Sequence, residues 1–414
     1  MLLKRILTLY IFLILSSLSL LASINFLYMY QAGYQPKDIM NFIQEFYEKT
    51  GMVVNVKFLL YDDMYENILV SREASKPIYD VVLVDLIWVP DFAKKKVVIP
   101  LNDLLKDDEF ADIPHKILNA FTYDGKLWAF PFLANIQHFY YNEAILKRAG
   151  ISHPPKTLEE MEEDARLIKK KGLMLYPIMD SWNDKEVLTC EFTWLLAAFG
   201  EDVFKNGQLN FNNIIGVRTI NYMKRLLDEG LMNPLSLDTN ENELRDAFVV
   251  GDVAFTTNWT YQYRYMKDPS YSKVVEESKI GLIPVSETNP LHLGSVTVSG
   301  YQGLGIMANS KNISESLQFI KALTSKEFYK KNTNEIPIYK SLYPSLKNDS
   351  RIKIEQLSYA HDRPKIEDYT DISRILRRYI RMALIGLLTP EDALSKAEKE
   401  INSILKIKYQ KVKN

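Results

Sequence analysis

The first hundred residues of the chain alternate between strand-like and helix-like patterns of apolar positions. Residues 36–50 carry apolar side chains at the spacing of one helix face, and Gly51 suits the C-terminus of that helix. Strand-like patterns cover 25–30, 53–59 and 79–85, the last apolar almost throughout. This alternation predicts an α/β fold, whose parallel sheet leaves a crevice at the carboxyl ends of its strands. Asp85 would lie at that crevice.

Two further helices have well-marked ends. Thr157 and Glu160 form a capping box, and the apolar periodicity that follows runs toward Gly172. Thr389 and Pro390 open another helix near the end of the chain. The sequence contains no repeat, no low-complexity tract and no long linker. We therefore expect two lobes between which the chain crosses more than once.

The length of the chain bears on the number of its lobes, and its charge bears on the partners that it can bind. Its 414 residues are 47% hydrophobic, and this length exceeds what one hydrophobic core usually spans. The 51 Lys and Arg residues nearly balance 52 Asp and Glu residues. Because nucleic-acid binding needs a basic surface, we expect no nucleic-acid partner.

Residues 1–23 are typical of an export signal, because Lys4 and Arg5 precede an apolar stretch that ends on small residues. The residue three positions before the expected cut is large, so an uncleaved membrane anchor is the alternative. Cys190 is the only cysteine, so no cysteine at the end of the signal carries a lipid. We expect an exported protein that is periplasmic or extracellular.

Catalytic motifs find little support. No phosphate-binding loop, zinc-protease helix or nucleophile elbow occurs, and the five histidines lack metal-ligand spacing. Gly303, Gly305 and Ala308 match a dinucleotide-loop pattern, but within a strand-like segment. We expect no catalytic residue, no metal and no cofactor. A secreted glycoside hydrolase that uses Asp85 and a second carboxylate is an alternative, because acidic residues are numerous.

The tryptophans favour a ligand rich in hydroxyl groups, such as a sugar, which needs flat apolar faces beside polar groups. Trp128 and Trp194 lie inside apolar runs and are expected in the core. Trp88, Trp182 and Trp259 follow polar or turn-like neighbours and are candidates for a cleft.

Tyr140 and Tyr141 suggest another ligand, because adjacent tyrosinates can bind ferric iron. In a strand their side chains would point to opposite faces, so one of them is expected in the core. Ferric iron, or a polyamine held by several carboxylates, is therefore the alternative to a sugar.

Six segments carry a resemblance to a known family. They are YDVVLVDLIWVPDFAKKKVVIPLNDLL (79–105), DGKLWAFPFLANIQHFYYNEAILKRAGISHPPKTLEEM (124–161), AFVVGDVAFTTNW (247–259), SGYQGLGIMANSKNISESLQFIKALTSKE (299–327), RPKIEDYTDIS (363–373) and MALIGLLTPEDAL (382–394). In this order they resemble the extracellular solute-binding proteins of sugar ABC importers, the group that contains maltose- and trehalose/maltose-binding proteins. Each segment alone matches the family only weakly, whereas the order and spacing of the six segments together are specific to the family.

The resemblance implies an α/β, two-lobe periplasmic-binding-protein fold of the type II-like class, joined by a hinge of several crossings. The crossings would lie near Ala134 to Asn135, near Ser299 to Gly300, and after Ser345. The implied division is a signal at 1–23, a first lobe of 24–134 plus 300–345, and a second lobe of 135–299 plus 346–414.

Residue patterns and resemblance together give a set of candidate ligand contacts between the lobes. The set is Tyr30, Gln31, Asp85, Trp88, Asn135, Trp182, Trp259, Tyr301, Gln302 and Arg363. Two positions depart from the family. Lys96 stands where a glycine is common at the end of a helix, and Asn135 stands where some maltose binders have Glu, which leaves the identity of the sugar open.

The implied function is capture of a sugar, a di- or oligosaccharide, by closure of the hinge. The closed protein would deliver it to ABC permease subunits that work with a cytoplasmic ATPase. We expect a monomer without enzymatic activity.

Overall fold

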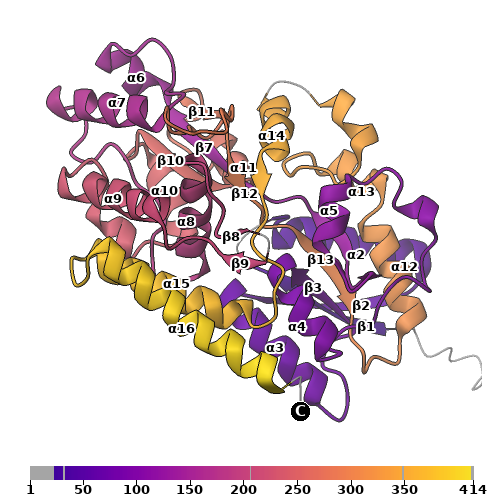
Figure 1. Cartoon of the computed structure of the whole chain (residues 1–414). Coiled ribbons are helices and arrows are strands. Elements are labelled where there is room, and N and C mark those ends of the chain that lie inside the picture. The colour runs from indigo at the N-terminus through magenta and orange to yellow at the C-terminus, as the bar shows by residue number, and fades with distance from the viewer. Residues whose placement is uncertain (1–22, 31–32, 206, 347–348, 412–414) are drawn as a thin grey trace, which may run out of the picture.

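The computed structural model describes residues 23–30, 33–205, 207–346 and 349–411, which form two lobes, each built around a β-sheet (Figure 1). The predicted signal lies outside the described residues except for Ser23. Helices and strands alternate along the chain, so the α/β expectation is confirmed. Within the described part of the chain, no helix is both long and apolar enough to cross a membrane.

The first lobe contains a five-stranded sheet in the order β2-β1-β3-β13-β6. Its strands are β1 (Ser23–Met29), β2 (Val53–Leu59), β3 (Val81–Asp85), β6 (Phe130–Leu133) and β13 (Gln302–Ile306). Strands β1, β2 and β3 are parallel, and β13 runs antiparallel to β3 and β6. The carboxyl ends of the three parallel strands therefore meet at one edge of the sheet.

Helices cover this sheet. They are α2 (Pro36–Thr50), α3 (Tyr61–Glu73), α4 (Val89–Lys94), α5 (His115–Ala120), α12 (Ile313–Leu323) and α13 (Lys326–Lys331), with the short turns η1 (Leu86–Trp88), η2 (Asp107–Glu109) and η4 (Lys340–Ser345) and the hairpin β4 (Thr122–Tyr123) and β5 (Lys126–Leu127). Helix α2 has the predicted bounds: Gln35 and Asp38 form a capping box at its start, and Gly51 ends it in the left-handed conformation with φ 71°.

The second lobe contains a three-stranded antiparallel sheet in the order β10-β7-β11. Its strands are β7 (Gln137–Asn142), β10 (Phe255–Trp259) and β11 (Ser278–Gly281), beside the hairpin β8 (Phe204–Lys205) and β9 (Gln208–Leu209) and the turn η3 (Pro234–Leu237). Its helices are α6 (Glu143–Ala149), α7 (Leu158–Lys170), α8 (Glu186–Ala198), α9 (Ile214–Asp228), α10 (Glu241–Val250), α11 (Gln262–Lys267), α14 (Asp349–Ser358), α15 (Tyr369–Leu384) and α16 (Pro390–Lys411).

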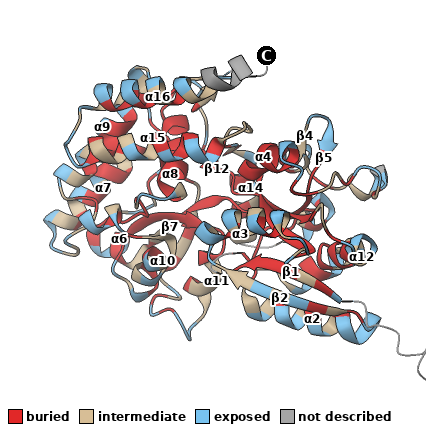
Figure 2. Ribbon diagram, turned by 90° about the horizontal axis from the view of Figure 1, so that it is seen from below, coloured by how far each residue is buried: buried red, intermediate tan, exposed pale blue. Residues whose placement is uncertain are grey.

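Helix α8 is the central helix of the second lobe. Every residue from Val187 to Ala198 is buried, the polar Thr189, Glu191 and Thr193 included, so other parts of the protein surround this helix (Figure 2). Helices α9 and α15 pack against it, and α16 runs alongside α15 (Figure 1). Helix α15 also contacts η1 of the first lobe, so it touches both lobes.

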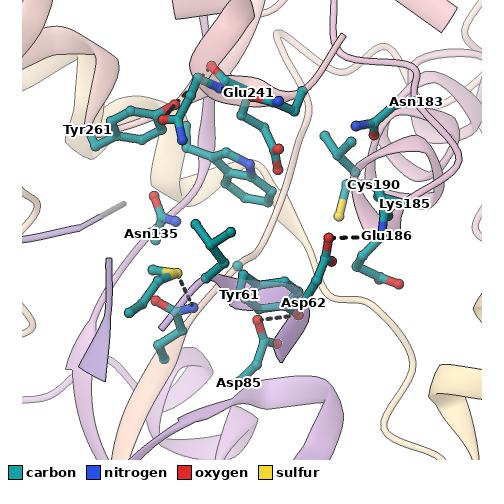
Figure 3. Close-up of a pocket in the computed structure, with 18 of the residues that line it drawn as sticks. Tyr61, Asp62, Asp85, Asn135, Asn183, Lys185, Glu186, Cys190, Glu241 and Tyr261 are labelled. Atoms are coloured by element: carbon teal, nitrogen blue, oxygen red, sulfur yellow. Dashed lines mark hydrogen bonds and ion pairs between the residues drawn. The ribbon is translucent and has the colours of Figure 1, made fainter. Parts of the chain in front are cut away.

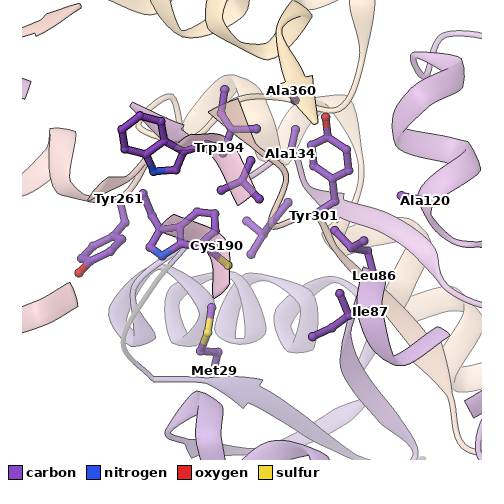
Figure 4. Close-up of a cluster of buried hydrophobic side chains, with 14 of the residues drawn as sticks. Met29, Leu86, Ile87, Ala120, Ala134, Cys190, Trp194, Tyr261, Tyr301 and Ala360 are labelled. Atoms are coloured by element: carbon purple, nitrogen blue, oxygen red, sulfur yellow. The ribbon is translucent and has the colours of Figure 1, made fainter. Parts of the chain in front are cut away.

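The chain segments that connect the two sheets lie side by side. One segment joins β6 to β7, and another joins β12 (Thr297–Val298) to β13. The Gly300 backbone N–H donates to the Asn135 carbonyl at 2.9 Å, and β12 pairs with β14 (Ala360–His361). Figure 4 shows buried side chains of both lobes in one cluster, with Met29 and Leu86 from the first lobe and Cys190 from the second.

Candidate ligand-binding site between the lobes

A cavity of about 250 Å³ lies between the lobes, and residues of both lobes line it (Figure 3). The first lobe contributes the carboxyl ends of its parallel strands. Met29 ends β1, Tyr61 follows β2, and Asp85 ends β3. Gln302 joins them because it pairs with Asp85 in the β13–β3 register. The topology of the sheet thus brings together side chains that are far apart in the sequence.

The second lobe contributes one strand end and two helix N-termini. Trp259 ends β10, and Asn135 lies in the connection between the two sheets. Glu186 and Glu241 are the first residues of α8 and α10. A carboxylate is favourable at a helix N-terminus because it complements the helix dipole, which explains why the sequence tolerates acids at these two positions.

A buried ion-pair cluster connects the two lobes at the cavity wall. Arg363 Nη2 donates to Asp85 Oδ1 at 2.9 Å, and Arg363 Nη1 donates to Glu186 Oε1 at 3.0 Å. The side chains of Arg363 and Asp85 are only 2% and 3% exposed. Glu186 also accepts hydrogen bonds from Tyr369 and Ser373. Burial raises the pKa of the Asp85 carboxyl, and Arg363 counteracts that effect.

Tyr61 provides an aromatic face that a second ring supports. Its ring is stacked on Trp88, with centroids 5.3 Å apart and planes at 25°. Its hydroxyl donates to Asp85 Oδ2 at 3.1 Å (Figure 3). These two contacts fix the ring beside the cavity, on the side of the first lobe.

Two amide groups present unused acceptors at the cavity. Asn135 Oδ1 and Gln302 Oε1 are buried and have no hydrogen-bond partner within the described residues. Both residues line the cavity and are 6% and 4% exposed. Because a buried acceptor without a donor costs free energy, a ligand that brings hydroxyl or amine donors would be favoured here.

Charged residues from opposite lobes also meet at the cavity. Lys185 Nζ lies 3.1 Å from Asp62 Oδ2, and both side chains are about half exposed, 56% and 49%. Asp62 belongs to α3 of the first lobe, and Lys185 precedes α8 of the second lobe. This ion pair bridges the lobes on the exposed side of the site.

Glu241 differs from the other acids of the cavity. Within the described residues its carboxylate forms no ion pair, and the neighbouring Trp259 side chain favours the ionised form. Burial raises the pKa of this carboxyl above its ordinary value. Figure 3 shows the side chain directed toward the middle of the cavity.

Five of the predicted contacts line the cavity: Asp85, Asn135, Trp259, Gln302 and Arg363. Their roles in binding stay predictions. Gln31 lies outside the described residues.

Four other predicted contacts do not line this cavity, and their roles in binding also stay predictions. Trp88 is buried behind Tyr61, and Tyr301 is fully buried, because alternation along the chain turns it away from the face that Gln302 occupies. Trp182 is 1% exposed and belongs to the hydrophobic core. Tyr30 follows β1 and is 56% exposed.

Several cavity residues were missed by the sequence analysis. They include Tyr61, Asp62, Lys185, Glu186, Glu241 and Tyr261. Glu186 and Glu241 each begin a helix, but an acid is favoured at the N-terminus of any helix, so this position does not mark them as cavity residues.

Tyr140 and Tyr141, the tyrosines considered as ligands of ferric iron, do not form a site together. Tyr140 is fully buried in the core of the second lobe, where its hydroxyl donates to the Trp259 carbonyl at 3.1 Å. Tyr141 is half-buried and packs against the larger core. Neither lines the cavity. The described residues contain no group of three or more His, Cys, Asp or Glu side chains placed to hold a metal ion.

Comparison with known proteins agrees with this architecture. A family model described as bacterial extracellular solute-binding protein matches residues 32–330. A putative binding protein of Brucella abortus is 21% identical over 371 residues, which cover 87% of each chain. The maltose-bound MalE3 of T. maritima has a TM-score of 0.84 at 22% identity, covering 92% of this chain and all of the other. A solute-binding protein of Thermotoga lettingae, bound with α-D-tagatose, also has a TM-score of 0.84 at 22% identity, covering 93% and 100% of the two chains. The fold is therefore the two-lobe fold of periplasmic binding proteins, as expected.

Proposed function

Because the chain belongs to the family of bacterial extracellular solute-binding proteins, we propose that its interlobe cavity captures a small sugar for an ABC importer. The maltose and tagatose complexes of proteins with the same fold support this ligand class. The cavity volume of about 250 Å³ lies just below the range of about 300–1,000 Å³ that is usual for ligand sites, and it favours one or two sugar rings over a longer oligosaccharide.

The observation that carries the proposal is the combination of aromatic rings with unused amide acceptors. Tyr61, Trp259 and Tyr261 offer faces for the C–H surfaces of a sugar ring. Asn135 Oδ1 and Gln302 Oε1 can accept hydrogen bonds from its hydroxyl groups. This pattern suits a compact solute that carries many hydroxyl groups.

The proposed mechanism is hinge closure. The lobes would comprise residues 24–134 plus 300–345 and residues 135–299 plus 346–414, and they would rotate about the connections near Asn135 and Gly300. A ligand that touches both walls would favour the closed form, because some of its contacts exist only when the lobes meet.

The test is a thermal-shift screen with monosaccharides, disaccharides and longer oligosaccharides, followed by calorimetric titration. A ligand at 100 times its Kd that binds only the folded state adds about 2.7 kcal/mol to the free energy of unfolding. Trp259→Ala should abolish the shift of the best ligand, whereas Tyr47→Ala, an exposed aromatic on α2, should keep it. The proposal fails if no sugar shifts the melting temperature, or if both variants respond like the wild type.

We further propose that the protein is an exported monomer that passes its ligand to a permease and does not act on it. Asp85, the acid of the hydrolase alternative, is held by Arg363 and Tyr61 and is therefore poorly suited to proton transfer. Product analysis after incubation with oligosaccharides tests this point, and any turnover would favour the hydrolase.

A further inference from the structure

The cavity has more acidic than basic side chains. Four carboxyl groups line it, from Asp62, Asp85, Glu186 and Glu241, against two cationic groups, from Lys185 and Arg363. The site therefore has an excess of negative charge when all six groups are ionised. A neutral sugar would leave that excess unchanged, whereas a ligand with a positive charge would reduce it.

Direct contacts within the protein pair three of the four carboxylates. Lys185 pairs with Asp62, and Arg363 pairs with Asp85 and Glu186. Arg377 adds a second cation 3.9 Å from Glu186. Glu241 remains the cavity acid that forms no ion pair within the described part of the chain.

The surroundings of Glu241 fix its position without neutralising it. The Asn240 side chain caps α10 by accepting from the backbone N–H groups of Asn242 and Glu243, so Glu241 is held at the first turn. The Trp259 side chain neighbours its carboxylate and favours the ionised form. The remaining acceptor positions of the carboxylate are directed into the cavity (Figure 3).

We propose that the sugar captured here is an amino sugar, whose ammonium group donates to the Glu241 carboxylate beside the ring of Trp259; this inference rests on the proposed function. The ammonium supplies the cationic partner that Glu241 lacks, and the neighbouring aromatic rings add cation–π attraction. The hydroxyl groups of the same ring remain available to Asn135 and Gln302. A uronic acid would be rejected, because its carboxylate would add to the negative charge.

The experiment uses matched pairs of sugars in which amines replace hydroxyl groups. Glucosamine and glucose, galactosamine and galactose, and mannosamine and mannose differ by one amine, and fully deacetylated chitobiose and cellobiose differ by two. Kd values are measured by calorimetry near pH 6.5 with the wild type and with Glu241→Gln. Asp246→Asn is the control, because it removes an exposed carboxylate from the same helix.

In at least one pair we expect the amine to bind about tenfold more tightly or better, which is within reach of one charge-assisted hydrogen bond. Glu241→Gln should bring the two Kd values of that pair together, whereas Asp246→Asn should keep their ratio. The inference is wrong if each neutral sugar binds as tightly as the corresponding amino sugar. It is also wrong if the ratio of the two Kd values is the same in Glu241→Gln as in the wild type. Either result leaves the proposed function unaffected. Failure of every sugar, neutral and amino, to bind would overturn both.

Discussion

Gly300 lies directly against the ring of Trp259, so that a Cβ atom added at Gly300 would come within 2.6 Å of Trp259 Cζ3. Gly300 also donates its backbone N–H to Asn135, and all three residues line the cavity. The absence of a side chain at Gly300 therefore sets where the Trp259 ring can lie. One connection between the sheets and one wall of the cavity depend on the same contact.

Gly300→Ala should weaken sugar binding, because the Trp259 ring that lines the cavity packs directly against Gly300. The added methyl group must displace the indole ring, and overpacking of this kind costs about 1–3 kcal/mol. We expect the Kd of the best sugar to rise about tenfold or more in calorimetric titration. Gly281→Ala in β11 is the control, because its added Cβ would meet Phe139 at an ordinary 3.4 Å. Equal Kd values for wild type and Gly300→Ala would contradict the role of Gly300.

Arg363→Met should destabilise the protein by about 3–5 kcal/mol, because it leaves the buried carboxylates of Asp85 and Glu186 without their shared cation. Because Asp85 takes part in this contact, a variant of Asp85 could lose sugar binding through damage to the contact between the lobes. A double-mutant cycle with Asp85→Leu and Arg363→Met, measured by urea unfolding, separates these effects. The double variant should be less destabilised than the sum of the two single variants. Additive losses would show that the pair is not coupled.

The sequence predicted the elements of the fold well where a local signal was sufficient. The helix 36–50 and the strand 53–59 have the predicted bounds, and the start of α7 is marked by Thr157, whose hydroxyl accepts from the Glu160 backbone N–H at 3.0 Å. These signals depend on side chains a few residues apart. They also placed Asp85 at the crevice, because the end of a buried parallel strand is a local property.

The residues that line the cavity were predicted less well, because the sequence does not show whether a side chain in a turn points into the cavity or into the core. Trp88 lies three residues after Asp85, yet it turns into the core and supports Tyr61, the residue that lines the cavity. Tyr301 and Gln302 are adjacent and face opposite ways. Glu186 and Glu241 come from separate helices, and their proximity follows from tertiary packing that no spacing in the sequence reveals.

Lys185→Met should weaken sugar binding by less than about fivefold, and the effect should disappear at high salt. Its ion pair with Asp62 joins the lobes, but both side chains are about half exposed, and pairs of this kind contribute about 0–1 kcal/mol. Titrations at low and high ionic strength would measure the change. Lys205→Met, which removes a similarly exposed lysine from its ion pair with Glu201, should leave the Kd unchanged. An effect of Lys185→Met that persists in high salt would indicate direct contact of Lys185 with the ligand.

Lys96→Gly should stabilise the protein by about 0.5–1 kcal/mol. Lys96 has φ 51°, a left-handed conformation that costs free energy for any residue with a Cβ atom and that glycine adopts readily. Lys95→Gly is the matched control: Lys95 has φ −78°, so glycine at that position should destabilise the protein. Urea unfolding would compare the two variants. A shift in the same direction for both would contradict backbone strain at Lys96.

The buried acids Asp180 and Glu191 should make the free energy of unfolding fall as the pH rises from about 4 to about 7. Burial raises the pKa of Asp180 to about 7 from an ordinary 3.8, and burial together with the neighbouring Asp180 raises the pKa of Glu191. Because the folded-state pKa values are raised, these acids stabilise the fold below their unfolded pKa and lose that contribution as the pH rises through the folded value. Asp180→Asn keeps an oxygen that can accept from the Thr257 backbone N–H, as Asp180 does at 2.6 Å, but it removes one titrating group. The difference in unfolding free energy between wild type and Asp180→Asn, measured by urea unfolding across this range, should therefore decrease with rising pH, and Glu191→Gln should behave in the same way. A difference that stays constant across the range would show that these carboxyls titrate normally in the folded protein.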